Sequence, residues 1–206
     1  MRRFSPLTRF VLSAFGWIIV LTVLWSQVSA WTSRPVAALA HLALEEGAPM
    51  WVRQVHVKPD SVELDSSVAI PIAQAGGRWA ELTVEVNPSR YAYGLTIFLG
   101  LLLAARGEGR WWRAAVGYVM LLPFQAFSLV FALLMQLVLS AETNIRYLRI
   151  SQWQMEAIVY AYQLGALVVP TLVPIVVWLW LDRAFVRDVL VRGWRESLRP
   201  AAQSPS

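Results

Sequence analysis

The chain has 206 residues, of which 57% are hydrophobic and only 15% are charged, and its mean hydropathy is +0.51. Globular domains average about 25% charged residues, so this composition excludes a cytosolic enzyme, a disordered chain and a simple secreted domain. The chain has no cysteine, which excludes disulfides, thiolate metal sites and a cysteine nucleophile. The net charge of +5 is in this setting a signal of membrane topology.

Four stretches without charged residues predict membrane-spanning helices. A span needs about 20 apolar residues. Three stretches have this length: 10–33, 114–141 and 157–181. The fourth, 91–105, reaches across a bilayer only if Arg90 and Arg106 snorkel outward or residues 88–90 add a turn. We accept it as the second span because the flanking charges otherwise fail to alternate.

The first stretch has two interpretations. Arg2, Arg3 and Arg9 precede it, and Val28-Ser29-Ala30 has a small-x-small pattern, which together are typical of a cleavable signal peptide. The apolar run 10–28 is longer than the core of a signal peptide, which is about 7 to 15 residues. We therefore favour an uncleaved helix.

The distribution of arginines predicts the orientation. Segments 1–9, 106–113 and 182–206 hold eleven basic and four acidic residues, whereas 34–90 and 142–156 hold seven basic and nine acidic residues. Basic residues accumulate on the cytoplasmic side. We therefore expect a multi-pass protein of the bacterial inner membrane with both termini in the cytoplasm.

Residues 34–90 form a segment that is too long for a simple connector and too patterned for a disordered chain. Segment 35–47 begins with proline and ends with glycine, which predicts a short helix. Segments 61–65 and 79–86 alternate between apolar and polar residues and segment 51–57 does so in part, which predicts a small antiparallel sheet with one apolar face. That face needs a cover, which is the short helix, the membrane surface or another protein.

The predicted fold is thus a mainly α integral membrane protein. It has four transmembrane helices and a small external α+β domain, an antiparallel sheet with its helix, between the first two. The expected parts are an N-terminus with the first span, a periplasmic domain, spans two to four, and an amphipathic cytoplasmic tail that binds an anionic leaflet or docks on a partner. Their ranges are 1–33, 34–90, 91–181 and 182–206.

Six residues are candidates for partner binding. Polar side chains at membrane depth are the usual functional candidates, prolines there kink helices and open grooves, and one tryptophan lies on the predicted sheet. The candidates are Gln125, Gln163, Pro123, Pro170, Pro174 and Trp79. The plainer interpretation of the first five is hydrogen bonding between helices and tolerated prolines. No ionisable residue lies centrally in a predicted span, which argues against pumps, ion-coupled carriers and intramembrane hydrolases.

The sequence indicates no catalytic residue, cofactor site or metal site. His41 and Glu45 have the spacing of two ligands on one helix face, but a third ligand is missing from the pattern. There is no phosphate-binding loop, no nucleophile motif and no nucleic-acid motif. The expected partners are membrane lipid and another integral membrane protein, and not a nucleic acid.

The order of the predicted spans and of the segments between them is characteristic. An arginine-led span precedes the external segment, which ends in Glu85-Val-Asn-Pro-Ser-Arg-Tyr-Ala-Tyr-Gly-Leu95. A short span, Arg110-Trp-Trp-Arg113, a glutamine-bearing span and a final span ending in Trp178-Leu-Trp-Leu-Asp-Arg183 come next. This layout resembles the exosortase H-associated membrane proteins of bacteria.

The resemblance implies an accessory role beside an exosortase, a polytopic protease that recognises C-terminal sorting signals on exported proteins. Such enzymes look to require Cys, Arg and His, so a chain without cysteine is not the exosortase itself. The accessory protein would bind the enzyme or the membrane tails of its substrates. One alternative is a structural subunit or assembly factor of a secretion, pilus or energy-conversion complex, and another is a small transporter.

Overall fold

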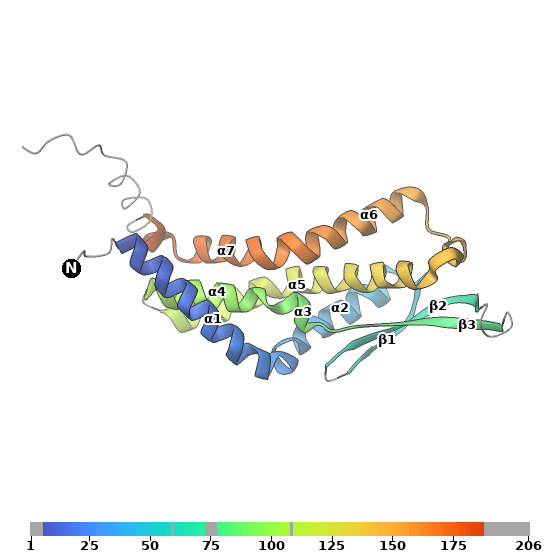
Figure 1. Ribbon diagram of the computed structural model, residues 1–206, viewed down its shortest axis with the longest axis horizontal. Helices are drawn as coiled ribbons and strands as arrows, with labels where there is room; N and C mark the ends of the chain where they lie inside the picture. Colours follow the sequence, from blue (N-terminus) through green and yellow to red (C-terminus); the bar gives the residue numbers. More distant parts are fainter. Residues whose placement is uncertain (1–5, 59, 73–77, 108, 188–206) are drawn as a thin grey trace, which may run out of the picture.

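The computed structural model describes residues 6–58, 60–72, 78–107 and 109–187. Several helices run along the long axis of the molecule, the first helix crosses them obliquely, and a small sheet flanks them at one end (Figure 1). Three parts of the chain lie together at the opposite end (Figure 1): the start of the first helix, the connection between α4 (Gly94–Ala105) and α5 (Arg110–Ala141), and the last described helix. The molecule therefore has a sheet end and a terminal end. The predicted amphipathic tail lies mostly outside the described residues.

Three helices are long and apolar enough to cross a membrane, as judged by length and composition. The first is α1 (Pro6–Thr32) and the second is α5 (Arg110–Ala141). The third is the run Gln152–Leu181, which consists of α6 (Gln152–Gln163), the π-helical η3 (Leu164–Val168) and α7 (Val169–Leu181). These helices coincide with the first, third and fourth predicted spans.

The predicted second span is a shorter helix. It consists of α3 (Ser89–Ala92) and α4 (Gly94–Ala105), which together form the apolar helix Ser89–Ala105. At 1.5 Å per residue it is about 25 Å long, against a hydrocarbon core of about 30 Å. The extra turn, one of the two ways in which the prediction let this segment cross, is present as α3, but a fourth crossing is not confirmed by length.

The predicted external helix and sheet are both present. Helix α2 (Arg34–Gly47) has proline in its first turn, where the missing N–H costs nothing. The three strands form an antiparallel sheet in the order β1-β2-β3. Their bounds are β1 Val52–Val57, β2 Val62–Ile72 and β3 Arg78–Val86. The strict alternation of β3 is confirmed, because Trp79, Glu81, Thr83 and Glu85 are all exposed and Val84 is buried.

Strand β2 continues several residues beyond the predicted segment 61–65. Its register with β3 shifts between Asp65 and Ala69, so the added part follows an irregularity that breaks the simple alternation. Pro71 lies in this added part, beyond Ser66, the last β2 residue paired with β1. Proline is tolerated there because that edge of β2 has no ladder hydrogen bond to lose.

Two helices of the same chain cover the apolar face of the sheet. Leu44 of α2, Leu64 of β2, Val84 of β3 and Leu133 of α5 are all at most 3% exposed and belong to one apolar core. The predicted cover by the short helix is therefore correct in part. Helix α5 is the second cover, and the sequence pattern did not point to it.

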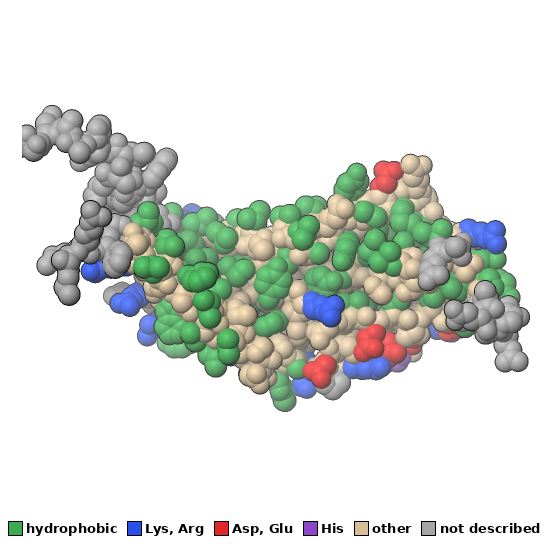
Figure 2. All heavy atoms as spheres, in the orientation of Figure 1, with side chains coloured by type: hydrophobic (Ala, Val, Ile, Leu, Met, Phe, Trp, Pro, Cys, Tyr) green, Lys and Arg blue, Asp and Glu red, His purple; other side chains and the backbone are tan. Residues whose placement is uncertain are grey.

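A second apolar core lies toward the terminal end. It contains Phe98 of α4, Leu121 of α5 and Trp178 of α7, which are at most 3% exposed. Phe10 of α1 stacks on Trp178, with ring centroids 5.5 Å apart. Helix α1 packs along α4, but Ala14 is its only buried residue, so most of its surface is accessible. Figure 2 shows hydrophobic side chains over the helices, with charged side chains concentrated over the sheet and at the terminal end.

Two glycines allow α4 to pack closely against its neighbouring helices. A Cβ on Gly94 would lie 2.8 Å from Cγ of Pro174 and 2.9 Å from the carbonyl oxygen of Pro170. A Cβ on Gly100 would lie 2.5 Å from Cγ1 of Ile18 in α1. Glycine at these positions lets the helices approach closely, as is common between membrane helices.

We expect Gly94→Ala to destabilise the bundle, because the oxygen of Pro170 belongs to the backbone and cannot rotate away. The expected loss is about 1 to 3 kcal/mol, measured as a lower thermal midpoint of the detergent-solubilised protein by size-exclusion chromatography after heating. Gly16→Ala is the control, since its Cβ would meet nothing within 4 Å and alanine favours a helix. Equal midpoints for the two variants would contradict the packing described here.

Candidate partner-binding surface

The structure places three of the six candidate residues inside the bundle. Gln125 is 4% exposed, and its Nε2 donates a hydrogen bond to the carbonyl of Ala92 over 3.3 Å. Pro170 and Pro174 are buried in α7 and face Gly94. These residues join α4 to α5 and to α7, and their described contacts are internal to the chain.

A π-helical turn precedes the prolines of α7. In η3 the N–H of Val169 donates to the carbonyl of Leu164, five residues back. Gly165 in this turn lies against α5, because a Cβ on it would be 2.9 Å from Cα of Ser128. The π-helical turn therefore ends α6 and allows a close contact between Gly165 and α5. It is followed by Pro170, which has no N–H to donate.

The other three candidates face outward. Pro123 in α5 and Gln163 at the end of α6 are exposed. Trp79 is 61% exposed on the sheet, and its ring meets Tyr147 of η2 (Glu142–Leu148) edge to face at 5.3 Å. The six residues therefore do not form one site.

The sequence analysis missed a buried ion pair. Arg113 at the start of α5 donates from Nη1 to Oδ1 of Asp182 over 2.7 Å, and Asp182 is only 2% exposed. Asp182 follows α7 and precedes α8 (Arg183–Phe185), so the pair ties the ends of two long helices together. Both residues lie in segments predicted to share one side of the membrane, but 69 positions separate them, and no sequence pattern indicates the pairing.

The free edge of β1 is capped by side chains of α2. His41 Nδ1 lies 3.0 Å from the carbonyl oxygen of Val55, and the N–H of Val55 donates to Oε1 of Glu45 over 3.4 Å. The other ends of the two side chains pair with each other, Nε2 to Oε2, at 3.4 Å. The spacing that suggested two metal ligands thus serves to satisfy an exposed strand edge.

The outer edge of β3 has no such cap. Among the described residues, no hydrogen bond joins its outward backbone groups to another segment. Beside the end of β3 lies a groove of about 310 Å³, lined mainly by polar surface from β3, α3, α5 and α6. Gln136 and Leu139 of α5, both exposed, line it together with Glu85, Arg90 and Tyr162.

The exposed face of the sheet carries pairs of opposite charge. Arg53 of β1 pairs with Glu81 of β3, and His56 lies 3.3 Å from Asp65. Lys58 pairs with Glu63, and this hydrogen bond is the main reason that the pKa of Lys58 lies above its ordinary value. Because they are exposed to solvent, these pairs add little stability.

The described residues contain no cluster of three or more potential metal ligands. The candidate site therefore consists of the unpaired edge of β3 and the polar groove beside it, which together suit binding of a polypeptide. The chain is a membrane protein with long apolar helices and a small sheet that packs on α2 and α5. This is the class that the fold defines.

Comparison with known families places the chain more closely. The family model described as "Exosortase H-associated membrane protein" matches residues 4–185, so the chain belongs to that family. The resemblance inferred from the layout of the sequence is thereby confirmed. Neither the curated proteins nor the solved structures include a match to this chain.

We expect Arg113→Gln to destabilise the protein strongly, because it leaves the buried carboxylate of Asp182 without its cation. Loss of one partner of a buried pair costs about 3 to 5 kcal/mol, and the lower end applies because the Arg113 side chain is 28% exposed. The readout is the thermal midpoint in detergent. Arg110→Gln, at an exposed arginine of the same helix, is the control and should have little effect.

The double variant Arg113→Gln/Asp182→Asn separates charge from folding. Neutralising both partners removes the uncompensated charge, so we expect it to recover part of the lost midpoint. No recovery in the double variant would show that the pair acts only through packing.

Proposed function

We propose that this protein is an accessory membrane protein that assists an exosortase-type protein-sorting protease. It binds the enzyme or the membrane tails of the enzyme's substrates and does not perform the cleavage. Membership of the exosortase H-associated family supports a membrane partnership with an exosortase. The absence of cysteine from the chain fits an accessory role, since the resemblance implies a cysteine in the protease.

The proposed topology has four crossings of the inner membrane, both termini in the cytoplasm and a periplasmic domain at 34–90. The arrangement of the described chain supports it, because the arginines 106, 110 and 113 and the start of α1 share the terminal end, opposite the sheet (Figure 1). The helix Ser89–Ala105 would make the second crossing, with Arg90 and Arg106 reaching toward the two surfaces.

The open edge of β3 is the observation that carries the binding role. An unpaired edge recruits an extended polypeptide as a further strand, in which main-chain hydrogen bonds supply affinity and side-chain pockets supply specificity. The opposite edge of the sheet is capped by His41 and Glu45, so the two edges are not equivalent. A partner strand therefore adds to β3 and lies over the groove that Gln136 and Leu139 line.

The position of this edge suits the segment of an exported protein that directly precedes its membrane tail. Strand β3 runs toward the bundle and is joined to α3 by Asn87 and Pro88 alone. An exported chain that enters the membrane beside α4 runs in the same direction, so it pairs with β3 in parallel. Trp79 and Gln163 lie on outward faces where they contact such a partner, whereas Gln125, Pro170 and Pro174 act by setting the helix geometry.

Site-specific photocrosslinking in native membranes tests this proposal. A photoreactive amino acid at Gln136 or Leu139 should capture the exosortase or an exported protein with a C-terminal sorting tail. The same amino acid at Gln54, an exposed residue of β1, is the matched control and should capture several-fold less. Mass spectrometry of the crosslinked bands identifies the partner.

A second variant tests the groove without a probe. Leu139 is 57% exposed, so Leu139→Arg should fold and should lower capture from Gln136 by several-fold. Equal capture from Gln54 and Gln136 would contradict the role of the β3 edge. Capture of a large stoichiometric assembly without an exosortase would instead support the structural-subunit alternative.

A further inference from the structure

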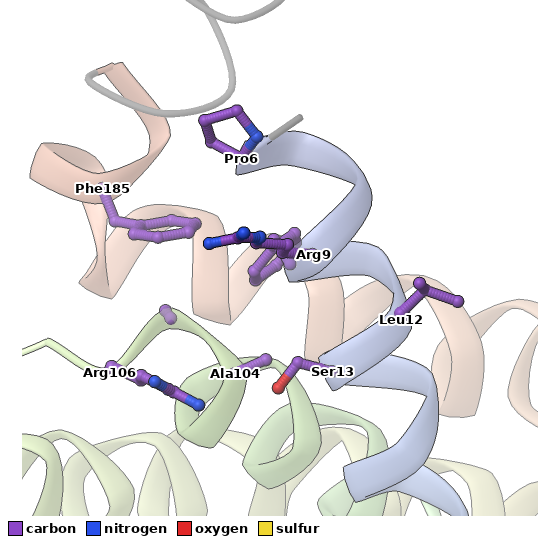
Figure 3. A pocket seen from close by; sticks show the side chains of 9 residues that line it. Pro6, Arg9, Leu12, Ser13, Ala104, Arg106 and Phe185 are labelled. Carbon is purple, nitrogen blue, oxygen red and sulfur yellow. The ribbon is translucent and has the colours of Figure 1, made fainter. Parts of the chain in front are cut away.

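The terminal end of the bundle contains a hollow of about 630 Å³. The start of α1, the end of α4 and α8 surround it, and Figure 3 shows Arg9 and Arg106 beside it, from two different helices. The rest of its lining is mainly apolar and includes Pro6, Phe10, Leu12, Ala104, Ala105 and Phe185.

Aromatic packing fixes one wall of this hollow. The ring of Phe10 stacks on Trp178 at 5.5 Å, and the ring of Phe185 lies 5.0 Å from Phe10. Trp178 is 3% exposed, so this wall continues the second apolar core. The hollow is therefore a feature of the packed bundle and not of a loop.

The two arginines bring positive charge to the hollow. Within the described part of the chain, neither Arg9 nor Arg106 forms an ion pair, and the nearby carboxylate of Asp182 is already bonded to Arg113. Arg106 adopts a left-handed backbone conformation, with φ of 53°, where the chain turns out of α4. Two guanidinium groups beside an apolar wall attract an anion with several acceptor oxygens.

A shallow groove continues from the hollow along α1. It has a volume of about 260 Å³ and is lined by Ser13, Gly16, Trp17 and Val20. Ser13 lines both the hollow and the groove. Gly16 leaves the groove open, because a Cβ there would meet nothing within 4 Å. The positively charged hollow is thus continuous with an apolar groove on a helix that is long enough to span a membrane.

We propose that this end of the bundle binds one anionic phospholipid. Its phosphate lies between Arg9 and Arg106, and one acyl chain follows the groove on α1. Lipid is the occupant that the setting supplies, because α1 is long and apolar enough to cross a membrane and buries only Ala14. The site is separate from the β3 edge and does not depend on the proposed function.

Native mass spectrometry of the full-length protein in detergent tests the site. With equal amounts of phosphatidylglycerol and phosphatidylcholine, the protein should retain phosphatidylglycerol preferentially. Arg9→Gln/Arg106→Gln should weaken this binding by about 30-fold, about fivefold for each arginine. Arg110→Gln/Arg183→Gln removes the same charge from two other exposed arginines and should change the binding by less than about threefold.

A further variant and a competitor test the lipid itself. Gly16→Leu fills the groove on the exposed helix and should weaken binding of phosphatidylglycerol while the protein stays folded. Inorganic phosphate at millimolar concentration should not displace the lipid. The proposal is overturned if both double variants lose the lipid equally, if phosphatidylcholine is retained equally, or if phosphate alone displaces the lipid.

Discussion

Helix α5 serves two apolar cores at once, and the rest of the structure depends on this. Its 32 residues make about 48 Å of helix, which exceeds a hydrocarbon core of about 30 Å. The half near the terminal end packs with α4 and α7, whereas the half near the sheet is covered by α2 and by the apolar face of the sheet. A sheet this small buries little surface alone, so it is stable because α5 continues beneath it.

This arrangement also makes the two edges of the sheet different. Strand β1 lies over α2, whose His41 and Glu45 reach the backbone of Val55. Strand β3 lies over α5, which offers the exposed side chains of Gln136 and Leu139 but no cap. A strand edge without a cap is a hazard for aggregation unless something covers it. The proposed partner strand would provide that cover and would place the partner directly above the bundle.

The charged side chains at the two ends of the molecule have different partners. At the sheet end, acidic and basic side chains pair with each other across the exposed face. At the terminal end, Arg113 forms an ion pair with the buried Asp182. Arg9 and Arg106 instead line a hollow and have no carboxylate partner among the described residues. The first arginine therefore supports the structure, and the other two remain available for an anionic ligand.

The sequence by itself determined the class of protein, three helices of spanning length, the α2 helix and the three strands. Each of these follows from local hydropathy or from a period of two residues, which the chain carries without reference to distant segments. Family membership was also visible in the order of those segments. The candidate site stays a prediction: the glutamines were chosen for polarity at membrane depth and the prolines for kinks that open grooves, and Gln125 and Pro170 make contacts inside the chain. Only the tertiary structure decided that α5 covers the sheet, that Arg113 meets Asp182 and that β1 is capped while β3 is open. These contacts join residues far apart in sequence, and many pairings satisfy the same local pattern until the helices pack.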